Sequence, residues 1–145
     1  MKIQVETVRE ADQELVEAFG RLLPQLSRSA RPLDARALAR LLASDATTVL
    51  VARADHDIVG TLTLTMVPLP SGLRARIEDV IVDEAARGHG IAGLLMEQAL
   101  GLAREAGTRT VDLTSRPDRE AANRLYERLG FQQRGSTVYR YPVGG

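Results

Sequence analysis

An apolar segment, A-R-I-E-D-V-I-V at residues 75–82, leads into the glycine-rich loop R-G-H-G-I-A-G at residues 87–93. Apolar residues then recur at helical spacing, so we predict a strand, a loop and an amphipathic helix. A glycine-rich loop at a helix start directs several free backbone N–H groups, and the positive end of the helix dipole, toward one point. This feature predicts a pocket for a phosphate or pyrophosphate group.

Other interpretations of the loop fit less well. Gly88-His-Gly90-Ile-Ala-Gly93 spells the dinucleotide fingerprint G-x-G-x-x-G, with Asp112 about 20 residues further on. That fingerprint belongs to the first strand of a fold with several further βα units, whereas here the chain nearly ends, and Asp112 falls inside its own strand. No Lys-Ser/Thr pair follows the glycines, which excludes a P-loop. A plain turn without a ligand would not require Arg87 and three glycines together.

The composition narrows the class of protein. A chain of 145 residues predicts one domain, residues 1–145. Nineteen basic residues balance nineteen acidic ones, so we expect no nucleic-acid or membrane partner. No apolar run approaches about 18 residues and no signal-peptide pattern opens the chain, which leads us to expect a cytoplasmic protein. Without cysteine, and with His56 and His89 far apart, we expect no metal site.

The pattern of apolar residues and turns predicts seven strands and four helices. The strands are expected at residues 1–8, 47–52, 58–67, 75–82, 110–115, 131–134 and 137–141. The second and third are expected to form a hairpin around the short polar turn at residues 54–57, with His56 exposed to solvent. The first helix is expected from Glu10 to Pro24, the second after an N-cap at Asp34, the third from the glycine loop to Gly107, and the fourth from about Pro117 to Gly130. This order gives a mixed α/β sheet rather than the strict alternation of a doubly wound parallel fold.

Two motifs at compatible spacing carry a family resemblance. They are Arg87-x-x-Gly90-x-Ala92, which follows the strand I-E-D-V-I-V, and N-R-L-Y-E-R-L-G-F at residues 123–131. Together they resemble the GNAT superfamily of acyl-CoA-dependent N-acetyltransferases. The resemblance implies a central, mostly antiparallel mixed sheet of about seven strands flanked by four helices. The strand I-E-D-V-I-V is also similar to that of glucosamine-6-phosphate N-acetyltransferases.

The resemblance implies acetyl-CoA as the co-substrate. The loop would hold its pyrophosphate through backbone N–H groups, with charge added by Arg87 and Arg128. The pantetheine arm would pair with residues 80–82 as an added strand, although these residues could equally be plain core strand. The coenzyme-binding residues expected on this basis are Val80, Ile81, Val82, Arg87, Gly88, His89, Gly90, Ile91, Ala92, Gly93, Asn123 and Arg128.

Tyr126 matches the family's tyrosine, whose phenol can protonate a departing thiolate. An ordinary packing role on an amphipathic helix is the alternative for a lone tyrosine. The family often has an asparagine seven residues before this tyrosine, where Arg119 stands here, so the coenzyme contact of Asn123 is less well supported.

Two carboxylates stand in the apolar strand. Glu78 and Asp79 are expected on opposite faces, because side chains alternate along a strand. By the resemblance, Glu78 is the general base that deprotonates the acceptor amine, directly or through water. A salt bridge from Glu78 to Arg74 or Arg76 is an equal alternative, and Asp79 could be structural or orient the substrate.

These features predict acetyl transfer to the primary amine of a small molecule. Because the chain has no cysteine, direct transfer in a ternary complex is favoured over an acyl-enzyme. A protein or peptide N-acetyltransferase and a non-catalytic acyl-CoA sensor are the alternatives. We expect residues 24–33 and 68–72 to shape the acceptor site. Homodimers are common in the superfamily, and the two C-terminal strands offer a surface for one.

Overall fold

The computed structural model describes residues 1–144 of the chain. Its backbone divides into two compact units that meet between Thr114 and Ser115, and each unit is described by itself. The expectation of a single domain over the whole chain stays a prediction.

The first unit is one mixed sheet with three helices. Its elements are β1 (Ile3–Val8), α1 (Gln13–Leu26), α2 (Ala35–Ala43), β2 (Thr47–Ala54), β3 (Asp57–Leu69), β4 (Gly72–Val82), the short helix η1 (Glu84–Ala86), α3 (Ile91–Glu105) and β5 (Thr110–Asp112). The strands lie in the order β1-β2-β3-β4-β5, antiparallel except for the parallel pair β4–β5. The prediction of a mixed, mostly antiparallel sheet is confirmed.

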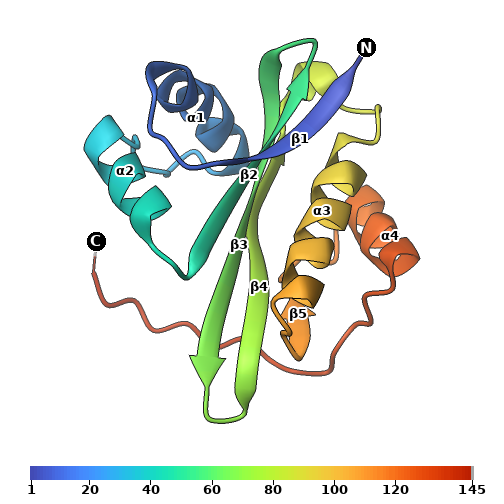
Figure 1. Ribbon diagram of the computed structural model, residues 1–145. Coiled ribbons are helices and arrows are strands. Elements are labelled where there is room, and N and C mark those ends of the chain that lie inside the picture. Colours follow the sequence, from blue (N-terminus) through green and yellow to red (C-terminus); the bar gives the residue numbers. More distant parts are fainter. Residues whose placement is uncertain (145) are drawn as a thin grey trace. The chain divides into compact units, whose positions relative to one another are not determined.

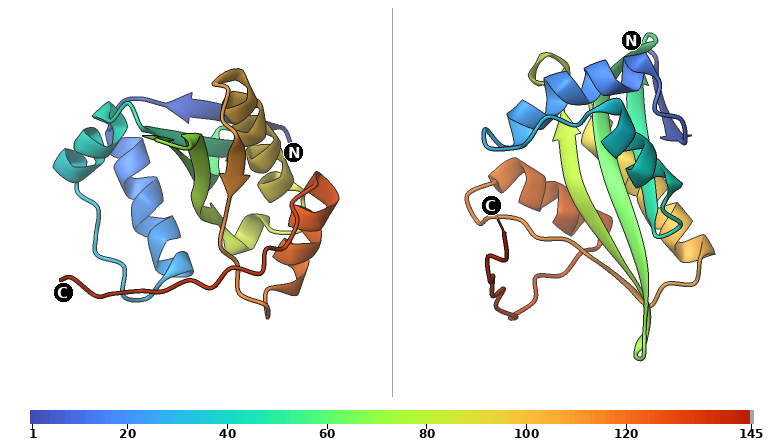
Figure 2. Two further views of the ribbon diagram at one scale, coloured as in Figure 1. Left: turned by 90° about the horizontal axis from the view of Figure 1, so that it is seen from below. Right: turned by 90° about the vertical axis from the view of Figure 1, so that its left-hand side faces the viewer.

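Helices cover both faces of this sheet. Figure 1 shows α1 and α2 on one face and α3 on the other, and the view from below in Figure 2 shows the same layers. On the first face, Phe19 and Leu22 of α1 and Leu38 of α2 pack with Val49 and Ile81 of the sheet. Side chains of α3 bury the second face, led by Leu95, Met96 and Ala99. The sheet is therefore a fixed platform for the segments that follow β4.

Aspartates cap the two N-terminal helices. An Asp12 carboxylate oxygen accepts a hydrogen bond from the Leu15 N–H at 2.9 Å, and Asp34 accepts one from the Ala37 N–H at 2.8 Å. Each bond satisfies a donor that the first helical turn leaves free, and the predicted cap at Asp34 is confirmed.

The first helix continues past Pro24, where the sequence predicts its end. Pro24 lies in the last turn of α1 and removes one backbone donor. The Ser27 N–H still donates to the Leu23 carbonyl at 3.1 Å, so the last helical turn is completed beyond Pro24. Burial of Phe19 and Leu22 stabilises the helix as a whole and outweighs the lost bond.

The described residues form five strands, so the prediction of about seven is wrong. Residues 131–144 have no regular secondary structure, and the strand predicted at 110–115 is only Thr110–Asp112. Two strands joined by a tight turn are marginal in water unless they bury an apolar face. Here Val138, Tyr139 and Tyr141 expose 69%, 91% and 86% of their surface, so no such face is buried.

The second unit contains one helix, α4 (Glu120–Leu129). Gly130 ends it in the left-handed conformation with φ 103°, as the sequence predicts. The Phe131 N–H donates to the Tyr126 carbonyl at 3.0 Å, and the two rings meet edge to face with centroids 6.1 Å apart. The start of the chain segment after α4 is thereby fixed to the tyrosine.

No helix within residues 1–144 is long and apolar enough to cross a membrane.

Arg53 joins β1, β2 and α1 through charged hydrogen bonds. Its guanidinium donates to Glu6 at 2.6 Å, to Glu14 at 2.9 Å and to the His56 carbonyl at 2.7 Å. These bonds hold the turn at Asp55 and His56, whose φ angles are 48° and 85°. The predicted β2–β3 hairpin and the exposed position of His56 are confirmed.

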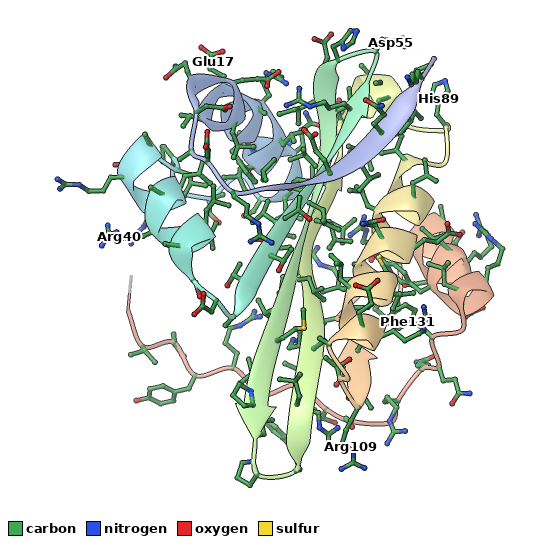
Figure 3. All side chains as sticks on the ribbon, in the orientation of Figure 1. Glu17, Arg40, Asp55, His89, Arg109 and Phe131 are labelled. Atoms are coloured by element: carbon green, nitrogen blue, oxygen red, sulfur yellow. The ribbon has the colours of Figure 1, made fainter. Side chains whose placement is uncertain are left out.

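Replacing Arg53 by glutamine is expected to lower the free energy of unfolding by about 1–2 kcal/mol at pH 7, because charged hydrogen bonds at a mostly covered side chain are lost. The Arg53 hydrogen bond lowers the pKa of Glu14 below its ordinary 4.5. A lowered pKa gives stability above the unfolded value that is lost as pH falls through the folded value. The difference between the proteins, measured by urea denaturation, should therefore shrink as the pH falls below 4.5. Arg40→Gln, at an exposed site on α2 (Figure 3), is the matched control and should change stability by less than about 0.5 kcal/mol.

Candidate functional site

The glycine loop opens α3 as predicted. Gly88 and Gly90 have φ angles of 86° and 75°, which glycine adopts without strain, and Gly90 is the N-cap residue. Apart from the adjacent residues, no protein atom lies within 4 Å of where a Cβ would stand at either glycine. The space beside the loop is therefore open, and a ligand could approach the backbone there.

The backbone N–H groups of residues 88–93 are unpaired within the described chain, and the first bond of the helix runs from the Leu94 N–H to the Gly90 carbonyl at 3.2 Å. No side chain caps the helix. Such donors, at the positive end of a helix of 15 residues, are suited to bind an anion.

Gly60 of β3 allows the start of α3 to lie close to the sheet. A Cβ at Gly60 would stand 3.2 Å from the Ile81 carbonyl oxygen and 3.3 Å from a methyl carbon of Ile91. Ile91 is itself buried. We did not predict this role from the sequence, although an isolated glycine in a strand is the signal for such close approach.

The strand β4 has an open edge next to this helix start. The short β5 pairs only with residues 74–76 of β4, through Arg74, Ala75 and Arg76. On that side, no strand of the described first unit covers residues 77–82, which include the predicted Val80, Ile81 and Val82. An open edge of this kind can take main-chain hydrogen bonds from an extended amide chain. The core role of Ile81 is confirmed, since its side chain is buried with residues of α1 and α2. Pairing of its backbone with the coenzyme stays a prediction.

Arg87 and His89 hold the loop to the end of β4. The Arg87 Nε donates to the Val82 carbonyl at 3.2 Å, and its guanidinium lies 3.9 Å from a Glu84 carboxylate oxygen. A His89 ring nitrogen lies 3.1 Å from the Ala86 carbonyl, and Figure 3 places this ring in the loop before α3. The Arg87 side chain is still 55% exposed, so its charge is accessible.

A β-bulge interrupts β4 where its two carboxylates stand. Thr61 of β3 pairs with Ile81, but Thr63 pairs with Glu78, so one residue of β3 faces two of β4. Asp79 occupies the bulge with φ 51°. The bulge disturbs the alternation of side chains at Asp79 and Val80, and the expectation that Glu78 and Asp79 lie on opposite faces stays a prediction.

Glu78 makes the salt bridge that the sequence offered as its alternative role. The Arg76 Nε donates to the Glu78 carboxylate at 2.9 Å, and the two side chains are 45% and 46% exposed. A second Arg76 nitrogen donates to the Thr114 hydroxyl at 3.0 Å. The guanidinium thus links β4 to the segment after β5 where these strands part.

The second unit carries the other predicted residues on α4. Burial raises the pKa of the Tyr126 phenol, and the nearby Arg119 charge opposes this only in part. Tyr126 is therefore protonated and able to donate at neutral pH. The Asn123 side-chain amide donates to the Arg116 carbonyl at 3.0 Å, which ties the loop before α4 to the helix. Arg128 is exposed in the last helical turn.

Comparison with known proteins identifies the family. The sequence model of the acetyltransferase (GNAT) family matches residues 10–131. The chain belongs to the GNAT family. The match includes the strand β4, the glycine loop and all of α4 with Tyr126. The matched region therefore also includes the helix start, the open strand edge and the bulge described above.

The proteins that are similar to this chain are named for different activities. The N-alpha-acetyltransferase 30 of Schizosaccharomyces pombe is 37% identical over 73 residues, which is 50% of this chain and 48% of the relative. A transcriptional regulator from Bacillus halodurans C-125 is 30% identical with a TM-score of 0.79, over 97% of this chain and 99% of that one. An aminoglycoside acetyltransferase from an uncultured soil metagenomic sample is 25% identical with a TM-score of 0.79, over 99% of this GNAT chain and all (100%) of that one.

This GNAT chain spans 26–48% of the length of the curated relatives that it matches. Within residues 1–144, no group of three or more histidine, aspartate or glutamate side chains could hold a metal ion.

Proposed function

We propose that this protein transfers an acetyl group from acetyl-CoA to the primary amine of a small molecule. The observation that carries the proposal is the row of unpaired N–H groups at residues 88–93, beside the open edge of β4. The first feature suits a pyrophosphate and the second suits the amide-bearing arm of the coenzyme. The aminoglycoside acetyltransferase among the similar structures supports a small-molecule acceptor.

In the proposed reaction, the loop amides and the accessible Arg87 charge bind the pyrophosphate. The acceptor ammonium loses a proton to a carboxylate of β4, either Glu78 or Asp79. Its nitrogen then forms a bond to the thioester carbonyl carbon and gives its second proton to water, and the carbon–sulfur bond breaks with its electron pair on sulfur. Tyr126, by its place in the family motif, donates its proton to that sulfur and regains one from water.

Direct transfer of this kind needs no acyl-enzyme, which suits a chain without cysteine. Asn123 and Arg128 have supporting roles in this proposal. The Asn123 hydrogen bond to Arg116 orders the approach to α4, and Arg128 adds positive charge for the coenzyme phosphates.

One observation favours a second candidate. The similarity to N-alpha-acetyltransferase 30 covers half of the chain, so a peptide N-terminus is the alternative acceptor. A panel of alkylamines, amino acids, aminosugars, aminoglycosides and short peptides, assayed with acetyl-CoA by release of free thiol, separates the two. Turnover of small amines with the highest kcat/KM supports the proposal, and turnover of peptides alone would replace it. Acetyl-CoA binding without turnover of any amine would indicate a sensor module.

A further inference from the structure

The bulge in β4 gives its two carboxylates different surroundings. The register shift leaves Asp79 and Val80 together opposite Leu62 of β3. Asp79 therefore sits outside the regular ladder, on the stretch of β4 that β5 does not cover. Its φ of 51° is a left-handed conformation that most side chains avoid, although aspartate and asparagine tolerate it. Strained positions of this kind gather at functional sites.

Glu78 is already engaged. Its carboxylate accepts the Arg76 hydrogen bond at 2.9 Å, and Arg76 is held in turn by Thr114 at 3.0 Å. A proton acceptor must have a free oxygen lone pair directed at the substrate and a reason to take the proton. The guanidinium occupies one Glu78 oxygen and offsets its charge, so Glu78 is poorly suited to that task.

Asp79 has the opposite character. No hydrogen bond or ion pair to its carboxylate exists within the described residues 1–144. Partial burial, followed by the negative charge of the adjacent Glu78, raises the pKa of Asp79 above its ordinary 3.8. Arg76 faces Glu78. A carboxylate with a raised pKa is a stronger base, and one without a partner is free to meet an ammonium group.

We infer that Asp79 is the catalytic base of the proposed acetyl transfer, and that Glu78, fixed by Arg76, is a positioning residue. This inference rests on the proposed function. The ammonium N–H bond breaks, its proton passes to an Asp79 oxygen, and the freed lone pair forms the new nitrogen–carbon bond. The carbon–sulfur bond breaks with its electron pair on sulfur, which takes the Tyr126 proton, and the nitrogen gives its second proton to water.

The test compares Asp79→Asn with Glu78→Gln, using ethylamine and 2,2,2-trifluoroethylamine as acceptors of nearly equal size. Asparagine tolerates the left-handed backbone as aspartate does, so the bulge is retained. An alkyl ammonium has a pKa near 10.4, so about one molecule in 10³ is neutral at pH 7. Asp79→Asn should therefore lower kcat/KM for ethylamine by about 10²–10³-fold at pH 7, with a rate that climbs as pH rises. For trifluoroethylamine, which is already neutral at that pH, the loss should fall below about tenfold.

Glu78→Gln should behave differently. Removing its charge lowers the pKa of Asp79, so the acidic limb of the kcat/KM profile should persist and move to lower pH.

The thermal stability of Asp79→Asn gives an independent readout. A raised pKa means that the folded state disfavours the ionised side chain, so stability is lost as pH rises through the folded value. Asp79→Asn should therefore melt no lower than the wild type at pH 7.

Several results would overturn the inference. Loss of the acidic limb in Glu78→Gln but not in Asp79→Asn would make Glu78 the base. An Asp79→Asn deficit equal for both amines, or accompanied by a lower melting temperature, would make Asp79 structural. Calorimetry with acetyl-CoA on the same proteins keeps the proposed function separate. If the wild type and both variants bind acetyl-CoA equally but the wild type transfers no acetyl group, the protein is a coenzyme-binding module and has no catalytic base. If the wild type does not bind acetyl-CoA, the proposed function itself is wrong.

Discussion

Gly90→Leu is expected to weaken acetyl-CoA binding by about 10²–10⁴-fold while the fold survives. The space beside Gly90 is free of protein atoms, so a leucine can be accommodated, but its side chain would occupy the region in front of the loop amides. Two charge-assisted hydrogen bonds, at about 1.5–3 kcal/mol each, account for this loss at 1.4 kcal/mol per factor of ten. Titration calorimetry with acetyl-CoA measures it.

Gly107→Leu is the matched control. Gly107 lies just beyond the other end of α3, has a φ of 78° against 75° at Gly90, and likewise has no protein atom within 4 Å of a Cβ position. Both variants should therefore lose similar stability, about 1–2 kcal/mol, from a side chain in the left-handed conformation. Only Gly90→Leu should lose coenzyme affinity. Equal affinities for the two variants would remove the loop from the binding site.

Tyr126→Phe is expected to lower kcat by about 10²–10⁴-fold with little change in acetyl-CoA affinity, the range typical of a lost general acid. Burial raises the pKa of this phenol above its ordinary 10, so the wild type keeps the proton across the neutral range. The wild-type rate should fall only when the solution is alkaline enough to ionise Tyr126, and the variant should lack that limb. Steady-state kinetics over a range of pH, at saturating acetyl-CoA, give both readings.

Tyr139→Phe removes the same hydroxyl from a side chain that is 91% exposed. Its kcat should stay within about twofold of the wild type, because surface substitutions away from a site have small effects. A Tyr126→Phe variant that also stays within a few-fold would assign Tyr126 to packing against Phe131 and leave water to protonate the thiolate.

Much of the fold follows from local patterns in the sequence. The Asp34 cap, the end of α4 at Gly130 and the β2–β3 hairpin each depend on a few neighbouring residues, and all three are confirmed. The loop at Gly88 and Gly90 likewise needs only backbone conformations that glycine favours. Local chemistry decides these elements, so the sequence alone predicts them.

Other features depend on contacts that local patterns do not contain. The bulge at Asp79 arises from the register between β3 and β4, which strand alternation alone cannot reveal. The Arg76 link to Glu78 and Thr114 depends on where β5 stops pairing. Alternation at residues 131–141 predicts strands, but strands also need a partner and an apolar face to bury. The inference that Asp79, rather than Glu78, is the base therefore depends on the strand register, which the sequence does not show.

Residue-resolved amide hydrogen exchange by NMR, with and without acetyl-CoA, tests the central claim most directly. Without ligand, the N–H groups of residues 88–93 have no partner within the described chain and should exchange rapidly. On addition of acetyl-CoA their exchange should slow by at least about tenfold, together with amides on the open edge of residues 80–82, while the Asp55–His56 turn stays unchanged. Unaltered exchange at residues 88–93 under conditions where acetyl-CoA is bound would contradict the account, because the coenzyme would then lie elsewhere.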